Sequence, residues 1–157
     1  ILLSVAGVPG IYIHSLLGSR NDLKGLRESG INRRINREKL HKETLIRELE
    51  TNPVRREIFR LFSRLIRIRR RQKAFSPQAL QQVVYLDERV FSIVRKHEQT
   101  GEELLVLVNV SGVPVDLNIP SRGFDLIGER RVGAHVCLHP YQCMWIAAET
   151  NVGMRSR

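Results

Sequence analysis

The sequence predicts a chain in two parts, an α/β part followed by an all-β part, and two patterns carry this prediction. Residues 8–37 contain one apolar, β-prone run that leads into a long polar loop, and helix-like spacing follows. From about residue 80 the apolar positions alternate with polar ones in short runs separated by turn-forming residues. A strand that leads into a polar loop is typical of the end of a (β/α)8 barrel at which ligands bind. Several short strands at regular spacing indicate a small antiparallel β-sandwich.

The first part is expected to contain a single strand. Residues 1–6 resemble the end of a helix, and residues 10–13 resemble one buried strand, which is too isolated to form a sheet alone. Residues 14–37 are predicted to be a loop, punctuated by glycines. Because the chain opens inside an apolar run, we expect it to be a fragment of a longer protein.

Two helices should close this part. Residues 38–50 have helical spacing, with Leu40, Leu45 and Leu49 on the expected buried side. The second helix, over 54–73, has Asn52 as a capping residue and Pro53 in its first turn. Its apolar stripe comprises Val54, Ile58, Leu61, Phe62, Leu65, Ile66 and Ile68, and its arginines Arg55, Arg56, Arg60, Arg64, Arg67 and Arg71 are predicted to lie largely on the opposite side.

The second part is expected to be the β-sandwich. Its predicted strands are residues 82–86, 89–97, 103–110, 113–119, 124–127, 134–138 and 142–148. These patterns predict one domain piece over 1–75, a sandwich domain over 76–150 and a polar tail over 151–157.

Composition and charge narrow the possible partners. The chain has 157 residues, of which 42% are hydrophobic and 27% charged, so it is globular rather than disordered. Its net charge of +10 is concentrated in residues 20–73, which hold 18 of the 26 Lys and Arg against 7 of the 16 acids. A small basic module that binds nucleic acid or a membrane is therefore one alternative. The arginines alternate with a strong apolar stripe and no aromatic stacking platform lies among them, so we favour a solvated helix face, with neither nucleic acid nor membrane as partner.

Motifs for metals, cofactors and common nucleophiles are missing from the sequence. The five histidines show no metal-ligand spacing with each other or with the cysteines, and no phosphate-loop or dinucleotide fingerprint is present. We therefore expect neither metal nor cofactor. Cys137 and Cys143 can face each other across a hairpin, but two reduced thiols in a cytoplasmic protein are the favoured interpretation. Asn109-Val110-Ser111 matches a glycosylation sequon, which matters only in a secreted chain.

The polar loop is the candidate ligand site. Asn21 and Asp22 come early in it, and the cluster from Arg33 to Arg37 comes late, so amide, carboxylate and guanidinium groups share one connection. This composition suits a polyhydroxylated or anionic ligand. The alternative is structural: Asp22 caps a turn and the arginines make ordinary ion pairs.

At these residues the sequence resembles a known family. Gly7-Val8-Pro9-Gly10-Ile11-Tyr12-Ile13 is similar to the eighth barrel strand of the α-amylase superfamily. Asn21-Asp22 followed by Arg33-Arg34-Ile35-Asn36-Arg37 resembles the sucrose phosphorylase branch, and the strand together with the I-N-R-E-K form is closest to phosphorylases of glucosylglycerate-like substrates. The segments 104–111 and 138–146 are similar to the β-domain that closes these enzymes.

The resemblance implies an assignment for each segment. Residues 1–6 would end the seventh barrel helix, 8–14 would form the last strand, 15–37 its active-face loop, and 38–73 the closing helices. Family members are retaining enzymes in which three carboxylates, all upstream of the eighth strand, act on the glucosyl group and phosphate replaces water, giving α-glucose 1-phosphate. This chain would then lack the catalytic carboxylates, be inactive alone, and depend on the missing N-terminal barrel of the same protein.

The resemblance also implies substrate-binding residues. The family's acceptor-site arginine falls at Arg33, whose guanidinium can bind phosphate through two parallel hydrogen bonds. Asn36 and Arg37 are expected to hold the loop in shape, and Asp22 is a candidate for the pocket wall. Sucrose phosphorylases often carry Asp where this chain has Arg34. The added positive charge at the mouth of the site favours an anionic acceptor such as glycerate over sucrose. The alternative within the superfamily is a hydrolase or transglucosidase that does not use phosphate.

Overall fold

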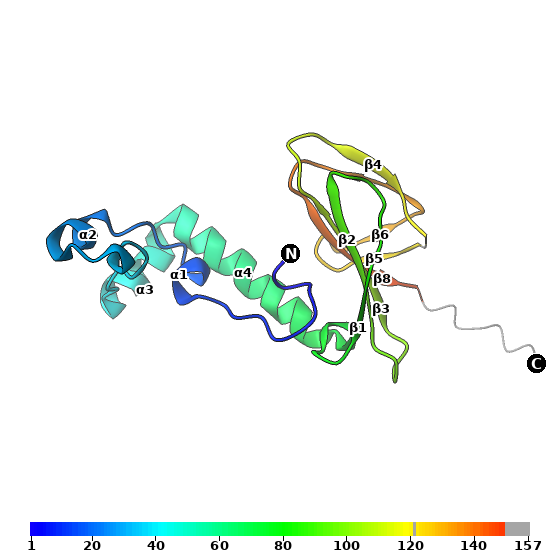
Figure 1. Cartoon of the computed structure of the whole chain (residues 1–157), viewed down its shortest axis with the longest axis horizontal. Helices are drawn as coiled ribbons and strands as arrows, with labels where there is room; N and C mark the ends of the chain where they lie inside the picture. The colour runs from blue at the N-terminus through cyan, green and yellow to red at the C-terminus, as the bar shows by residue number, and fades with distance from the viewer. Residues whose placement is uncertain (121, 150–157) are drawn as a thin grey trace, which may run out of the picture. The chain divides into compact units, whose positions relative to one another are not determined.

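The computed structural model describes residues 1–120 and 122–149, and these form two compact units (Figure 1). One unit is Pro9–Arg67, and the other combines Ile1–Val8 with the chain from Ile68 onward. The predicted tail over 151–157 lies outside the described residues. The division into a barrel piece over 1–75 and a sandwich over 76–150 stays a prediction.

The unit Pro9–Arg67 is helical. It contains α1 (Ile13–Leu16), α2 (Leu23–Ser29), the 3₁₀ helix η1 (Asn32–Asn36), α3 (Lys42–Thr51) and most of α4 (Pro53–Arg71). The helix predicted over 38–50 therefore begins four residues later and ends one residue later than expected.

The predicted strand over 10–13, or 8–14 by resemblance, is wrong for the described structure. Residues 8–12 have no regular structure, and α1 begins at Ile13. A strand exists only with a hydrogen-bonding neighbour, and the described part of this unit contains no second strand to pair with it. The polar connection also differs from a plain loop, because α2 and η1 form within it. Residues 1–6 form turns rather than the end of a helix.

The start of α4 confirms the predicted cap. The side-chain oxygen of Asn52 accepts hydrogen bonds from the backbone N–H groups of Val54 and Arg55, both at 3.1 Å. These two groups would otherwise have no partner at a helix N-terminus, and Pro53 needs none because it has no N–H.

Most of the predicted arginine face of α4 is solvated, since Arg56, Arg60, Arg67 and Arg71 are exposed, but Arg55 of that set is buried. The guanidinium of Arg55 donates to the carbonyl of Leu17 at 3.0 Å and pairs with Glu48 at 3.2 Å. Arg69, near the helix end, is buried as well and donates to the carbonyls of Leu3 and Gly7. Meanwhile Val54 and Leu61 of the predicted apolar stripe are exposed.

The second unit contains two antiparallel sheets. The larger has the order β1 (Leu80–Val83), β2 (Val90–Lys96), β3 (Glu103–Asn109), β8 (Cys143–Ala148), β5 (Gly123–Asp125) and β6 (Arg130–Val132). The smaller pairs β4 (Val115–Asn118) with β7 (His135–Leu138). Side chains of both sheets share one apolar core, including Leu107, Leu117 and Leu138, so the predicted antiparallel sandwich is present.

The central strands of the larger sheet are buried on both faces. One face packs against the smaller sheet through residues such as Leu105 and Met144. The other carries Leu104, Val106 and Trp145, and the Trp145 ring meets Phe75 of the 3₁₀ helix η2 (Lys73–Phe75) edge-on at 4.7 Å between ring centres. A strand covered on both faces has a continuous apolar run instead of alternation, as in residues 104–108.

The segment Ile1–Val8 is held on this unit by side chains. Arg95 is fully buried and donates to the backbone carbonyls of Ser4 at 3.0 Å, Ser76 at 2.9 Å and Leu80 at 3.2 Å. The Trp145 indole N–H donates to the Ser4 hydroxyl at 2.9 Å. These contacts supply partners for a segment that has no regular structure of its own.

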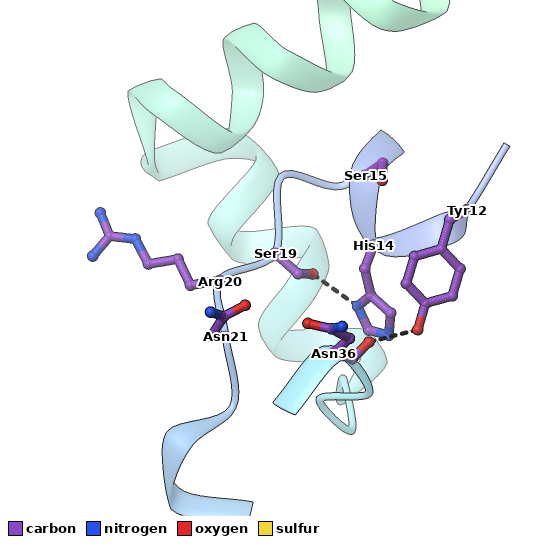
Figure 2. A pocket seen from close by; sticks show the side chains of 7 residues that line it. All are labelled: Tyr12, His14, Ser15, Ser19, Arg20, Asn21 and Asn36. Atoms are coloured by element: carbon purple, nitrogen blue, oxygen red, sulfur yellow. Dashed lines mark hydrogen bonds between the residues drawn. The ribbon is translucent and has the colours of Figure 1, made fainter. Parts of the chain in front are cut away.

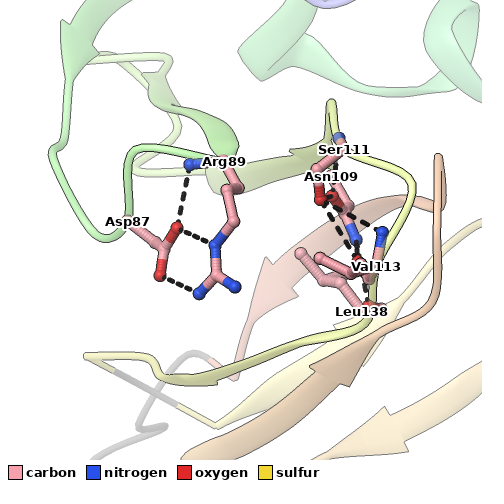
Figure 3. Close-up of polar contacts among 6 residues, drawn as sticks. All are labelled: Asp87, Arg89, Asn109, Ser111, Val113 and Leu138. Carbon is pink, nitrogen blue, oxygen red and sulfur yellow. Dashed lines mark hydrogen bonds and ion pairs between the residues drawn. The ribbon is translucent and has the colours of Figure 1, made fainter.

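Asn109 is a second buried polar hub, shown in Figure 3. Its amide nitrogen donates to the carbonyls of Val113 at 2.7 Å and Leu138 at 3.2 Å, and its oxygen accepts from the Ser111 hydroxyl at 2.7 Å. Because Asn109 is only 1% exposed and both ends of its amide are engaged, the sequon at this position has a structural role instead of a modification role. Cys137 and Cys143 are free, and they lie in different sheets.

Candidate functional site

The unit Pro9–Arg67 contains a polar hollow of about 290 Å³. It forms where α1, the connection after it and η1 meet (Figure 2). The residues that line it are Tyr12, His14, Ser15, Ser19, Arg20, Asn21 and Asn36. They come from sequence positions up to 24 apart, so the fold of the connection brings them together.

Hydrogen bonds and ring contacts fix the side chains of the hollow. Nδ1 of His14 and the Ser19 hydroxyl are 2.9 Å apart. The Tyr12 and His14 rings lie 5.2 Å apart between centres, and the Tyr12 hydroxyl donates to the backbone carbonyl of Asn36 at 2.5 Å. Figure 2 shows the imidazole between Ser19 and Tyr12, with Asn36 beside it. The two ends of the polar connection are thereby tied together around one imidazole.

The three predicted substrate-binding residues, Asn36, Arg33 and Asp22, lie in different environments. Asn36 lines the hollow. Arg33 lies in the same 3₁₀ helix η1, is exposed, and is not among the residues that line the hollow. Whether either residue binds a substrate stays a prediction.

Asp22 has the structural role that we weighed as the alternative. It is the N-terminal cap of α2, where its carboxylate accepts from the backbone N–H of Gly25 at 2.8 Å. The same carboxylate is 3.4 Å from the guanidinium of Arg34. A side chain at position 25 would collide with it, since a β-carbon there would lie 2.2 Å from an Asp22 carboxylate oxygen. Asp22 therefore organises the loop from outside the hollow.

Arg34 is occupied by the same arrangement. Besides the ion pair with Asp22, it donates to the carbonyl of Arg37 at 3.3 Å. Its charge is compensated and its geometry is set by the loop, so it is not an unpaired cation at the mouth of a site.

Sequence reasoning missed most of the hollow. Tyr12 and His14 were assigned to a strand, and Ser19 and Arg20 were treated as parts of a generic loop. The available signal was the pair His14-Ser15, two polar side chains directly after the apolar run Ile11-Tyr12-Ile13, at the point where a strand would deliver its ligands.

The hollow contains a cation and no acid. Arg20 lines it, and none of the described residues that line it is an Asp or a Glu. Among the described residues, no group of three or more His, Cys, Asp and Glu is placed to hold a metal ion. No helix of the described residues is long and apolar enough to cross a membrane. The hollow can donate hydrogen bonds to anions and exchange them with hydroxyl groups.

Comparison with known proteins confirms the resemblance read from the sequence. The chain is 41% identical over 149 residues to the glucosylglycerate phosphorylase of Escherichia coli, covering 93% of this chain and 26% of that protein. It is 39% identical over 125 residues to the glucosylglycerate phosphorylase of Spirochaeta thermophila, covering 79% of this chain and 21% of that protein. The match lies in the C-terminal part of these relatives, and the chain spans about a fifth to a quarter of their length. No family model matches the chain.

Solved structures of the α-amylase superfamily share the fold. The trehalulose synthase of Pseudomonas mesoacidophila superimposes with a TM-score of 0.52 at 22% identity, over 59% of this chain and 18% of that one. An Anoxybacillus α-amylase gives a TM-score of 0.51 at 12% identity, over 62% of this chain and 24% of that one. At such identities the likeness concerns the fold alone.

Proposed function

We propose, from the similarity of this chain to the C-terminal part of glucosylglycerate phosphorylases, that it forms the acceptor-side part of a retaining glycoside phosphorylase. The complete protein would transfer an α-glucosyl group between a small polyol or sugar and inorganic phosphate, giving α-glucose 1-phosphate. The identity of 39–41% to proteins with this name is the observation that carries the proposal.

Catalysis of this kind needs a carboxylate nucleophile and a carboxylic acid on either side of the glycosidic bond. We propose that these groups lie in an N-terminal barrel outside this chain. Two observations support this division. None of the described residues lining the hollow carries a carboxylate, and the nearby Asp22 is engaged with Gly25 and Arg34. The role left to this chain is to bind the group that receives or leaves the glucosyl residue.

Arg33 is our candidate phosphate ligand. It is exposed in η1, and among the described residues it has no ion pair or hydrogen bond that would engage its guanidinium. A planar guanidinium can bind two phosphate oxygens in parallel and can also donate to hydroxyl groups. Asn36, three residues later, lines the hollow and offers an amide for a hydroxyl of the acceptor.

The assay is phosphorolysis by the complete protein that carries this chain. With a glucosylglycerate substrate, α-glucose 1-phosphate should form only when inorganic phosphate is present. Release of free glucose at the same rate without phosphate would instead identify a hydrolase or transglucosidase. Residues 1–157 alone should release no sugar phosphate, and activity in that chain would refute the assignment of the catalytic acids to another part of the protein.

We propose a cytoplasmic location and no role in binding nucleic acid or membranes. The two free thiols support the location, since reducing compartments keep cysteines in this state. The burial of Arg55 and Arg69 supports the second point, because these two cations of α4 are used inside the fold. A salt-sensitive mobility shift with duplex DNA or RNA, or co-sedimentation with anionic vesicles, would refute it.

A further inference from the structure

We infer that Arg55 is a positioning residue of the hollow: from α4 it holds the connection that carries Ser19 and Arg20, without touching a bound molecule itself. Arg55 is buried and is not among the described residues that line the hollow. It therefore acts through the backbone at the end of α1. The effect of Arg55 on the reaction rests on the proposed function, whereas its contacts lie within the unit Pro9–Arg67.

Helix α1 ends in a sharp turn that brings Ser19 back to the helix. Leu17 is the C-cap residue, and Gly18 follows with a φ of 60°, in the left-handed region. The backbone N–H of Gly18 donates to the carbonyl of Ser15 at 3.4 Å. The backbone N–H of Ser19 donates to the carbonyl of His14 at 2.9 Å. These two bonds form a Schellman motif, and they place the Ser19 hydroxyl 2.9 Å from Nδ1 of His14.

Arg55 satisfies the carbonyl in the middle of this turn. Its guanidinium donates to the carbonyl of Leu17 at 3.0 Å, in a buried contact between residues 38 positions apart. Nε of the same guanidinium lies 3.2 Å from the carboxylate of Glu48 in α3. A planar guanidinium presents several N–H donors in fixed directions, so it can bind both groups at once. Because a buried carbonyl without a donor is costly, this contact fixes the position of Leu17.

The first turns of α4 also pack directly against Gly18. A β-carbon at position 18 would lie 2.8 Å from Cδ1 and 3.4 Å from Cβ of Ile58. Ile58 comes three residues after Arg55, so the two side chains share one side of the helix. The backbone N–H of Arg55 is itself bonded to the capping side chain of Asn52 at 3.1 Å. The capped end of α4 therefore holds two consecutive residues of the connection, Leu17 and Gly18.

The side chains that this arrangement positions are those of the next two residues. Ser19 and Arg20 directly follow Gly18, and both line the hollow. Figure 2 shows them on one connection, with Ser19 directed at His14 and Arg20 extending away from it. Loss of the Arg55 contact would free the carbonyl of Leu17 and let this connection shift. Since a displacement of one ångström in a binding group can lower a rate by about 100-fold, a residue outside the hollow can control binding inside it.

The first measurement is NMR of the histidine ring nitrogens in the chain of residues 1–157. The His14 signals are identified by their loss in His14→Gln. Arg55→Met keeps an unbranched side chain but removes its donors, and Arg55→Lys keeps one charged donor group. Arg60→Met is the matched control, because Arg60 is an exposed arginine of the same helix. The backbone amide signals outside residues 13–20 report that each variant is folded.

We expect Arg55→Met to move the His14 ring signals toward those of Ser19→Ala, in which the hydrogen bond to Nδ1 is absent. Arg55→Lys should move them less, because an ammonium can donate to the carbonyl of Leu17 but lacks the planar fork that also binds Glu48. Arg60→Met should leave them in place. If Arg55→Met does not fold, Glu48→Gln replaces it, since loss of this partner loosens the guanidinium and should move the signals in the same direction.

The second measurement is the kinetics of the complete protein, assayed well below the melting temperature of every variant. Arg55→Met should raise the KM for phosphate by about tenfold, because the lining of the hollow is displaced. The KM should rise less in Arg55→Lys and stay unchanged in Arg60→Met. A purely structural role predicts the opposite split, in which fewer molecules are folded, so kcat falls and KM stays the same.

Unchanged His14 ring signals in a folded Arg55→Met chain would overturn the inference, and so would an equal movement in Arg60→Met. A lower kcat with an unchanged KM would also overturn it, since Arg55 would then only keep the protein folded. Failure of the proposed function gives a different result. If the complete protein forms no sugar phosphate, the phosphorylase is refuted, and the ring signals alone decide the role of Arg55.

Discussion

Replacing Arg95 by methionine is the change that tests most sharply how the β-sandwich unit holds Ile1–Val8. Arg95 is fully buried, and its guanidinium donates to four backbone carbonyls, those of Ser4, Ser76, Ala79 and Leu80, at 2.9–3.3 Å. No carboxylate is among these partners. Burial lowers the pKa of the Arg95 guanidinium, and neighbouring Arg69 lowers it further.

Two effects of opposite sign decide the outcome. Methionine leaves the carbonyls of Ser4 and Ala79, whose bonds to Arg95 are buried, without a donor, at a cost of about 1–3 kcal/mol each. It also removes the desolvation of a buried cation, which is why apolar replacements of buried ions are sometimes neutral or stabilising. Both carbonyl oxygens are acceptors, so neither can replace the lost donor for the other. We therefore expect the cost of the unpaired carbonyls to exceed the gain from removing a buried cation. The predicted net loss is about 3 kcal/mol of the free energy of unfolding.

The measurement is urea unfolding followed by Trp145 fluorescence, since the indole N–H is bonded to Ser4 and reports on the same contact. Arg131→Met is the matched control, because Arg131 is exposed and its ion pair with Glu149 should contribute at most about 1 kcal/mol. An Arg95→Met chain as stable as the unmodified one would refute the reasoning. It would mean that relief of desolvation balances the four hydrogen bonds.

Three further changes test other parts of the fold. Gly123→Ala would place a β-carbon 2.3 Å from the Ala147 carbonyl oxygen in the β5–β8 pair, so it should cost about 1–3 kcal/mol in urea unfolding, whereas Gly133→Ala meets nothing within 4 Å and should be near neutral. Asn52→Ala removes the cap of α4 and should lower the stability of the helical unit by about 0.5–2 kcal/mol. Thr51→Ala is the control. Identical thermal unfolding curves of the two variants, followed by circular dichroism, would contradict this prediction. The hydrogen bonds from Arg89 hold the pKa of Asp87 at about 2, below its ordinary 3.8 (Figure 3), so this carboxylate stabilises the fold at neutral pH and that contribution is lost as pH falls from 3.8 to about 2. In Asp87→Asn the free energy of unfolding should therefore fall less steeply as the pH is lowered through this range. The same pH dependence in the variant and the unmodified chain would contradict the role given to Asp87.

The β-sandwich could be read from the sequence because local patterns determine it. Strand β3 was predicted over 103–110 and forms over Glu103–Asn109, since a run of apolar residues bounded by turn residues needs no distant information to be recognised. The face that Arg95 occupies could not be predicted. An arginine in a strand usually points to solvent, and only the arrival of Ser4 and Ser76 from elsewhere in the chain supplies acceptors for it.

The candidate site was predicted in outline and missed in detail for the same reason. Asn36 was named from its motif and does line the hollow, while His14 and Ser19 were overlooked because their pairing depends on how the connection folds back. The strand over 10–13 failed because a strand requires a neighbour to bond with, and propensity alone does not provide one. Asp22 carried both a functional and a structural interpretation, and its contacts with Gly25 and Arg34 match the structural one.

The central claim is that this chain supplies the phosphate-binding side of a glycoside phosphorylase, and Arg33→Ala in the complete protein tests it most directly. Arg33 is exposed in η1, so its removal should leave the melting temperature unchanged. Loss of a charge-assisted contact worth about 1.5–3 kcal/mol should raise the KM for phosphate by about tenfold or more. Arg27→Ala, an exposed arginine of α2, is the control and should leave that KM unchanged. A KM for phosphate that is the same in Arg33→Ala as in the unmodified enzyme would contradict the account.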